Sequence, residues 1–340
     1  MAANTTDQNK LPRWLAIALV SLAGLLLEVG YTRIVSFKLL YYYTYLVIGL
    51  SLLGIGSGAI AVAMWAPIRR ATTERVIALC SLVAAVSIPL GYLVVARLRI
   101  DTLAIWDYGS GSSFASLGRL ALICFVLFAS FVALGMIVAT MLGRAGDRVG
   151  RLYFADLVGA GLGCMLAIPL ITRLGAPAVV MCAALVFALV GLLTVPRRPL
   201  FAAGSAVLAA TLVVAVVARD ELPDVITEEN KLPADGPGIL FSDWGPVFRV
   251  DVVRLPGPDD TRFPLHDGTH GSGIWRFDGN TDTLGRFDTD PRAIPFGVLG
   301  EPPERELIIG SAGGQEILAS LYFDAPTSRR SSSIPSPCHC

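Results

Sequence analysis

Seven long apolar runs occupy the first two thirds of this 340-residue chain and decide what it can fold into. They lie near 14–35, 39–66, 76–96, 120–142, 152–172, 174–195 and 199–218. Each run is close to the roughly 20 residues that a helix needs to cross a hydrocarbon core of about 30 Å. With 54% hydrophobic and 16% charged residues, the chain is more apolar than an ordinary soluble domain. We therefore expect a helical membrane domain over 14–218 with about seven spans, after an N-terminal tail at 1–13.

The charges beside these runs leave the orientation open. Seven spans put ten Lys and Arg residues on one face and eight on the other, which decides nothing under the positive-inside rule. A re-entrant run at 152–172 would also change the parity. We expect a multi-pass protein of the cell (inner) membrane with a cytoplasmic C-terminal region, because nucleotide-like cofactors are found there. The lipid bilayer is the expected partner, a homo-oligomer stays open, and no nucleic acid is expected.

Two acidic residues, Glu28 and Asp156, stand inside apolar runs. Ionisable groups are costly in a bilayer, so each needs a partner. Glu28 could pair with Arg33 or with another helix, and Asp156 lies near Arg151 at a helix start. For Glu28 we favour an ion pair that fixes helix packing, with a substrate or proton site as the alternative, and for Asp156 we favour a headgroup-level or helix-start role over transport chemistry.

Glycines recur in two of the runs with small-xxx-small spacing, which predicts close approach of neighbouring helices. They are Gly49, Gly54, Gly56 and Gly58 in the second run and Gly159, Gly161 and Gly163 in the fifth.

Few side chains in the sequence suggest a metal site. His266 and His270 are better explained as parts of a polar loop, and Cys338, His339 and Cys340 form a poor site at a terminus. We expect no metal and no disulfide framework.

Composition changes after Arg219 towards Pro, Gly and charged residues, which predicts a linker and a small β module over 219–300. The stretch "GILFSDWGPVFRVDVVRL" indicates two short strands or one bent strand. In "GIWRFDGNTDTLGRFD", the Asp278-Gly279 dipeptide predicts a turn between extended segments.

A strand, a glycine turn and a helix start follow one another in "LIIGSAGGQEIL". The strand Leu307–Ile309 is expected to end at Gly310, and the helix to begin near Gln315. Such a loop presents backbone N–H groups and a helix N-terminus to polar ligand atoms. We expect the first β-α unit of a Rossmann-like domain at 301–325, and a tight turn without a ligand is the alternative.

At these residues the chain resembles the membrane-embedded spermidine synthase-like proteins, which join a multi-span domain to an aminopropyltransferase-type fold related to class I methyltransferases. The resemblance runs from about 14 to 325 and rests on Glu28, Thr32 and Arg33 and on "RLYFADLVGAGLG", "SDWGPVFRVDVV", "FDGNTDT" and "PERELIIGSAGGQEILASLYFDA". It implies a transferase of S-adenosylmethionine type. It also implies that S-adenosylmethionine or its decarboxylated form contacts a loop of five residues: Gly310, Ser311, Ala312, Gly313 and Gly314.

The chain departs from that family after Asp324. The family's second strand, its ribose-binding acidic residue and its catalytic Asp have no counterpart in "APTSRRSSSIPSPCHC", and the glutamine that follows Asp-Gly in polyamine-making members is missing from "FDGNTDT". We expect 326–340 to be a disordered tail, with a frameshift as one explanation, and a truncated chain that is inactive and binds no cofactor. No catalytic residue is assigned. A membrane transporter or lipid-handling protein with a regulatory C-terminal module is the alternative function.

Overall fold

The protein is described from a computed structural model, which covers residues 11–107, 111–194, 199–228, 231, 238–254 and 261–325. The expected tail at 326–340, with its two cysteines and one histidine, lies outside these residues, as does most of the N-terminal tail. The chain divides into two compact units, one of residues 1–234 and 244–248 and one of residues 235–243 and 249–340.

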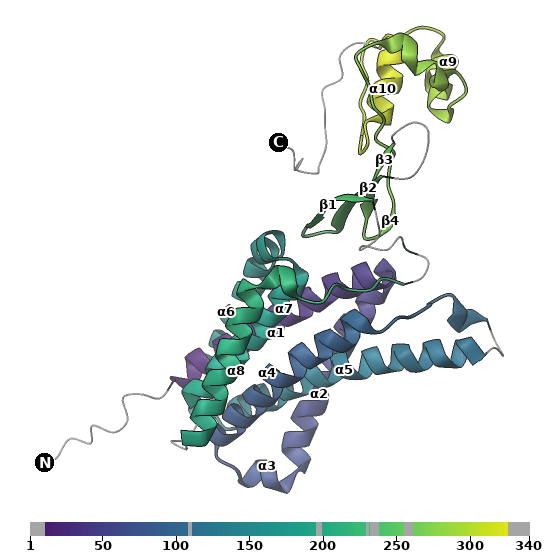
Figure 1. The fold of residues 1–340 in the computed structure, drawn as a ribbon. Helices are drawn as coiled ribbons and strands as arrows, with labels where there is room; N and C mark the ends of the chain where they lie inside the picture. The colour runs from purple at the N-terminus through teal and green to yellow at the C-terminus, as the bar shows by residue number, and fades with distance from the viewer. Residues whose placement is uncertain are drawn as a thin grey trace, which may run out of the picture. The chain divides into compact units, whose positions relative to one another are not determined.

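The first unit is helical (Figure 1). Its helices are α1 (Arg13–Lys38), α2 (Thr44–Met64), α3 (Ala66–Arg70), α4 (Thr73–Arg97), α5 (Gly111–Gly143), α6 (Val149–Leu174), α7 (Ala176–Thr194) and α8 (Pro199–Val217). In the described part of the chain, six segments are long and apolar enough to cross a membrane: Arg13–Lys38, Tyr41–Met64, Thr73–Arg97, Gly111–Gly143, Gly146–Leu174 and Ala176–Thr194. The multi-pass helical character is therefore confirmed.

The expected count of about seven spans is corrected to six such segments and one shorter apolar helix. The seventh run, 199–218, forms α8, and its apolar stretch Phe201–Val217 is shorter than the other six.

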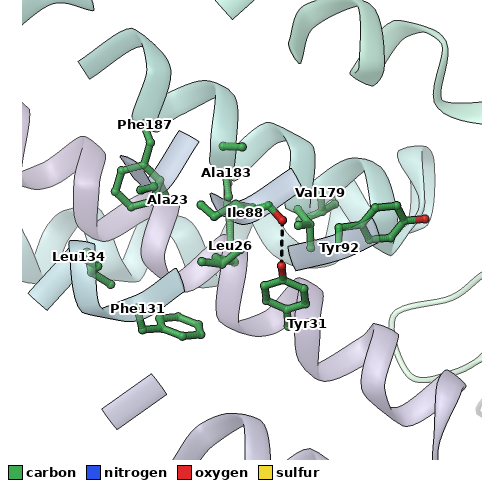
Figure 2. Packing of buried hydrophobic residues seen from close by; sticks show 14 of the residues in the cluster. Ala23, Leu26, Tyr31, Ile88, Tyr92, Phe131, Leu134, Val179, Ala183 and Phe187 are labelled. Atoms are coloured by element: carbon green, nitrogen blue, oxygen red, sulfur yellow. Dashed lines mark hydrogen bonds between the residues drawn. The ribbon is translucent and has the colours of Figure 1, made fainter. Parts of the chain in front are cut away.

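The apolar core of this unit forms around α1, which packs against α2, α5, α6 and α7. Large side chains from several helices interlock there, among them Leu26, Phe131 and Phe187 (Figure 2). The Tyr31 hydroxyl is fully buried and donates a 3.1 Å hydrogen bond to the Ile88 carbonyl oxygen, as Figure 2 shows. A buried hydroxyl needs such a partner, because leaving it unpaired in an apolar medium is costly.

Glycines set the closest helix contacts, as the spacing predicted. A Cβ at Gly159 or Gly163 of α6 would lie 2.1 or 2.6 Å from a backbone oxygen of α1. A Cβ at Gly58 of α2 would lie 2.4 Å from the Val132 oxygen of α5. Real side chains never come so close, so these backbones touch only because the positions are glycine.

The second unit holds a small antiparallel sheet with strand order β1-β2-β3-β4, followed by short helices. The elements are β1 (Ile239–Trp244), β2 (Arg249–Arg254), β3 (Arg262–His266), β4 (Thr269–His270), α9 (Ile294–Leu299) and α10 (Gln315–Tyr322). The predicted Gly-Pro break therefore separates two strands, β1 and β2. In the β2–β3 pair, Val252 lies opposite Pro264.

Two local expectations in this unit are wrong. The segment with His266 is a hairpin rather than a plain polar loop, because Asp267 and Gly268 both take positive φ and join β3 to β4. After Asp278-Gly279 the chain forms a 3-10 helix, Thr281–Asp288, rather than a second extended segment. Asn280 explains this change, since its side chain accepts a hydrogen bond from the Asp282 N–H and caps that helix.

Candidate functional site

The glycine turn has the left-handed backbone that its sequence requires. Gly310, Ala312 and Gly314 have φ values of 72°, 34° and 81°. The helix α10 begins directly afterwards at Gln315, where it was expected. Glycine adopts such φ values without a steric penalty, so the turn reverses the chain tightly before the helix.

The strand that was expected to lead into this turn does not form. Among 301–310 only Ile309 takes part in an isolated bridge, and the side chains of Leu307 and Ile309 are 70% and 83% exposed. A strand is stabilised by the hydrogen bonds and side-chain contacts of its neighbours. The described residues supply no neighbouring strand here, so the apolar sequence alone does not order 307–309 as a strand. The Rossmann-like unit is thus seen only as a turn and a helix.

A network inside the second unit holds the turn in place. A Cβ at Gly313 would lie 2.4 Å from the Gly273 carbonyl oxygen, so the lack of a side chain there is explained by contact within the protein. The Gln315 side-chain amide donates a 2.6 Å hydrogen bond to the same oxygen and accepts one of 3.1 Å from Arg286. The Arg286 guanidinium also lies 4.0 Å from the centre of the Trp275 ring. The buried side-chain amide of Gln315 and the stacked guanidinium of Arg286 therefore hold the turn in place.

The sides of the turn that face away from this network are open. No atom lies within 4 Å of the place where a Cβ would stand at Gly310 or Gly314, whereas Ser311 is buried. Three of the five expected site residues, Gly310, Ala312 and Gly314, are therefore at least partly open, whereas Ser311 is buried and Gly313 packs against the Gly273 carbonyl oxygen.

The first turn of α10 also carries a charged pair. Glu316 accepts a 3.0 Å hydrogen bond from Arg292, which also donates to Asp290. Burial raises the pKa of Asp290, but the hydrogen bonds and charge of Arg292 outweigh burial and hold that pKa below its ordinary value. Asp290 is thus ionised at neutral pH, and Arg292 lies between two carboxylates.

The first unit contains a buried polar cluster that the sequence analysis missed. Lys38 at the end of α1 is fully buried, and its ammonium donates a 2.7 Å hydrogen bond to the Ile226 carbonyl oxygen. Glu228 is 1% exposed and accepts a hydrogen bond from the Thr102 hydroxyl. Lys231, also buried, donates to two carbonyl oxygens of α1. Glu228 and Lys231 were overlooked because 219–238 reads as a polar linker in composition.

The two acidic residues inside the apolar runs lie against neighbouring helices. Asp156 of α6 accepts a hydrogen bond from the Ser21 hydroxyl of α1. Glu28 of α1 lies near Ser51 of α2, whose hydroxyl donates a 2.9 Å hydrogen bond to the Ile48 carbonyl oxygen of its own helix. In the described ranges, Glu28 does not pair with Arg33 and Asp156 does not pair with Arg151, because residues five apart lie on different faces of a helix.

The described ranges contain no group of three or more His, Cys, Asp or Glu side chains that could hold a metal ion. No family model, curated protein or solved structure matches this chain.

Proposed function

We propose that this chain is a multi-pass membrane protein of the spermidine synthase-like type, related to transferases that use S-adenosylmethionine or its decarboxylated form. The helices reside in the inner membrane and the second unit lies in the cytoplasm, where such a cofactor is present. The turn of residues 310–314 begins a Rossmann-like unit and supplies part of the cofactor site.

The left-handed backbone at Gly310, Ala312 and Gly314, directly ahead of α10, carries this proposal. A turn of this kind gathers backbone N–H groups, and the start of a helix adds a partial positive charge. The open space at Gly310 and Gly314 admits a ligand to the backbone.

Glu316 lies in the first turn of α10 and is hydrogen-bonded to Arg292. A phosphate at the start of the helix would add negative charge beside this carboxylate, whereas the positively charged sulfonium of S-adenosylmethionine is compatible with it. We therefore expect S-adenosylmethionine, rather than a phosphate-bearing nucleotide, at the turn.

The test is amide hydrogen exchange on the full chain in lipid nanodiscs, with S-adenosylmethionine at millimolar concentration. Although the truncated site is too small for stable binding, we expect weak contact at this concentration to slow exchange at 310–316 and to leave the rest of the second unit unchanged. We expect ATP to give no such protection. Calorimetry should detect no binding, because a single turn offers few contacts against an association cost of roughly 4–15 kcal/mol. Protection by ATP, or none by S-adenosylmethionine, would refute the proposal.

Two matched glycine variants localise the effect. Gly310 and Gly300 have nearly equal φ values of 72° and 70°, and both have open space at the Cβ position. Alanine at either position costs about 1–2 kcal/mol in the left-handed region. We expect Gly310→Ala to remove the protection by S-adenosylmethionine and Gly300→Ala to keep it. Equal behaviour of the two variants would place the ligand away from the turn.

The transporter or lipid-handling alternative gains no support from the acidic residues. Asp156 accepts a hydrogen bond from Ser21 across the α1–α6 contact, and Glu28 of α1 lies near Ser51 of α2, an arrangement that favours a packing role.

A further inference from the structure

One end of the helical unit exposes a group of arginines on the connections between its helices. At this end α1, α4 and α6 begin, and α2 and α5 end. Its segments 64–75 and 143–151 contain six arginines and only two carboxylates. Five of the arginines are exposed and are called here the basic end of the bundle: Arg69, Arg70, Arg75, Arg148 and Arg151.

The sixth arginine, Arg144, holds two of these connections together. Its guanidinium donates hydrogen bonds of 2.7 to 3.2 Å to three carbonyl oxygens within residues 68–71, at the end of α3. The last carbonyls of a helix lack partners inside it, so this contact fixes α3 against the end of α5. Arg13 of α1 likewise binds Glu74 of α4 at 2.7 Å. The helix ends that carry the basic end are therefore held together by contacts within the protein.

The charge of the basic end is not neutralised by the chain. Within the described ranges, none of its five guanidinium groups takes part in a hydrogen bond or an ion pair. Of the two carboxylates in these segments, Glu74 is bound to Arg13, and Asp147 is the other. A concentration of like charge is favourable only where a counter-charge is supplied, so this end fits an anionic partner.

Apolar side chains border the basic end. Met64 and Trp65 are exposed where α2 ends, and Tyr153 and Phe154 are exposed near the start of α6. Exposed apolar side chains on a spanning helix face lipid, and Trp and Tyr gather at the depth of the lipid headgroups. A ligand at this end therefore meets arginines beside an apolar surface. That combination matches a phosphate group carried on acyl chains better than it matches a soluble anion.

We propose that the basic end of the bundle binds anionic phospholipid, with the headgroup phosphate among the arginines and the acyl chains along α2 and α6. Arginine suits this role, because its planar guanidinium forms paired hydrogen bonds with phosphate oxygens. Each Lys or Arg near an anionic membrane surface strengthens binding about fivefold. The proposal is independent of the cofactor assignment, and since phospholipids occupy both leaflets it holds on either side of the membrane.

Tryptophan quenching by brominated lipids tests the lipid preference at each end of the bundle. Trp65 marks the basic end, and Trp106, between α4 and α5, marks the opposite end; they are 64% and 65% exposed. One protein keeps Trp65 and the other keeps Trp106, with Trp14 and Trp275 replaced by Phe in both. Trp244 packs against the core and stays in both, so the difference between the proteins reports the two ends.

The full-length proteins are reconstituted in vesicles with brominated phosphatidylglycerol or brominated phosphatidylcholine. We expect phosphatidylglycerol to bind about tenfold more tightly than phosphatidylcholine at Trp65, since several arginines contribute, and with nearly equal affinity at Trp106. An equal preference at the two ends, or a preference below about twofold at Trp65, would overturn the proposal.

Paired substitutions then assign the preference to the arginines. Arg69→Gln with Arg70→Gln, and separately Arg148→Gln with Arg151→Gln, should lower the preference at Trp65, and at least one pair should lower it by about threefold or more. Arg97→Gln with Arg99→Gln, at exposed arginines of the opposite end, should leave it unchanged. An unchanged preference in both pairs, or an equal loss in the control, would rule out this site.

Inorganic phosphate distinguishes a lipid headgroup from a soluble anion. Millimolar phosphate should reduce the preference at Trp65 no more than sodium chloride of equal ionic strength does, because the acyl chains add contacts that free phosphate lacks. A loss of the preference in phosphate but not in chloride would identify a site for a soluble anion and would overturn the proposal.

Discussion

The ammonium group of Lys231 closes the C-terminal end of α1. It donates hydrogen bonds of 2.9 and 2.7 Å to the carbonyl oxygens of Ser36 and Phe37, which belong to the last turn of the helix. The last carbonyls of a helix have no partner inside it, and a cation there also interacts favourably with the helix dipole. A residue almost 200 positions along the chain therefore caps the most central helix of the membrane unit.

Replacing Lys231 should destabilise the helical unit. Lys231→Met keeps the aliphatic stem but leaves two buried carbonyl oxygens without a donor, and we expect a loss of about 2–4 kcal/mol in the free energy of unfolding. The measurement is denaturant unfolding in detergent, followed by helical circular dichroism. Arg99→Met, at an exposed cation near the same end of the bundle, is the control and should change stability by less than about 0.5 kcal/mol. An equal loss in both variants would contradict the capping role.

Sequence reasoning found the wrong charges in this region for a physical reason. Glu28 and Asp156 stood out because each interrupts an apolar run, yet neither forms an ion pair with the arginine five positions away, and Asp156 is bound by the Ser21 hydroxyl instead. Lys38 comes at the end of its run and looked like an interfacial charge, although it is fully buried. Its burial depends on the main chain at Ile226, far away in sequence, and no local pattern reveals such a contact.

The contacts between helices show what the spacing of small residues predicts and what it does not. The small-xxx-small pattern predicted close contacts, and the structure confirms them at Gly54, Gly58, Gly159 and Gly163. The other glycines of the two runs, Gly49, Gly56 and Gly161, have no neighbouring atom within 4 Å. Positions four apart lie on one face of a helix, so the pattern specifies a face, but only the packed structure shows which face meets a partner.

Two glycines of α6 offer a comparison within one helix. Gly159→Ala would place a Cβ 2.1 Å from the Ala18 oxygen, so α1 and α6 must separate, and we expect a loss of about 1–3 kcal/mol. Gly161→Ala meets open space and should be neutral or stabilising by up to about 1 kcal/mol, since alanine is the better helix former. Thermal unfolding of the two variants in the same detergent measures the difference. A stable Gly159→Ala protein would contradict the close α1–α6 contact.

The turn at 310–314 and the segment before it differ in how well their sequences predict them. The turn is largely a local matter, because Gly310 and Gly314 take positive φ without a steric penalty, and contacts with Gly273 then hold it in place. The apolar segment Leu307–Ile309 favours a β-strand by composition, but a strand forms only where neighbouring strands are present to pair with it. The expected helix start at Gln315 was correct for the same reason as the turn.

At the scale of the whole molecule, the length and the apolar surface of α8 bear on which compartment the chain enters after Val217. At 1.5 Å per residue its 19 residues extend about 28 Å, close to the roughly 30 Å of a hydrocarbon core. One side of α8 buries Ala209 and Leu212, while Val207, Val214 and other apolar residues remain exposed. A helix that is apolar on its free side as well is suited to lipid rather than to water.

Although α8 is shorter than the six segments counted above, its length and its apolar free side suit a crossing, and we expect fusions on its two sides to report opposite compartments. Reporters fused after Arg70 and after Thr194 should lie on the same side as the N-terminus, because two and six spans precede them. A reporter after Leu240 should lie on the other side, in the cytoplasm, as the proposed cofactor requires. Identical signals at Thr194 and Leu240 would show that α8 lies along the surface instead. Opposite signals with Leu240 outside the cytoplasm would agree with a crossing by α8. They would contradict the S-adenosylmethionine proposal, because the turn would then face a compartment without the cofactor.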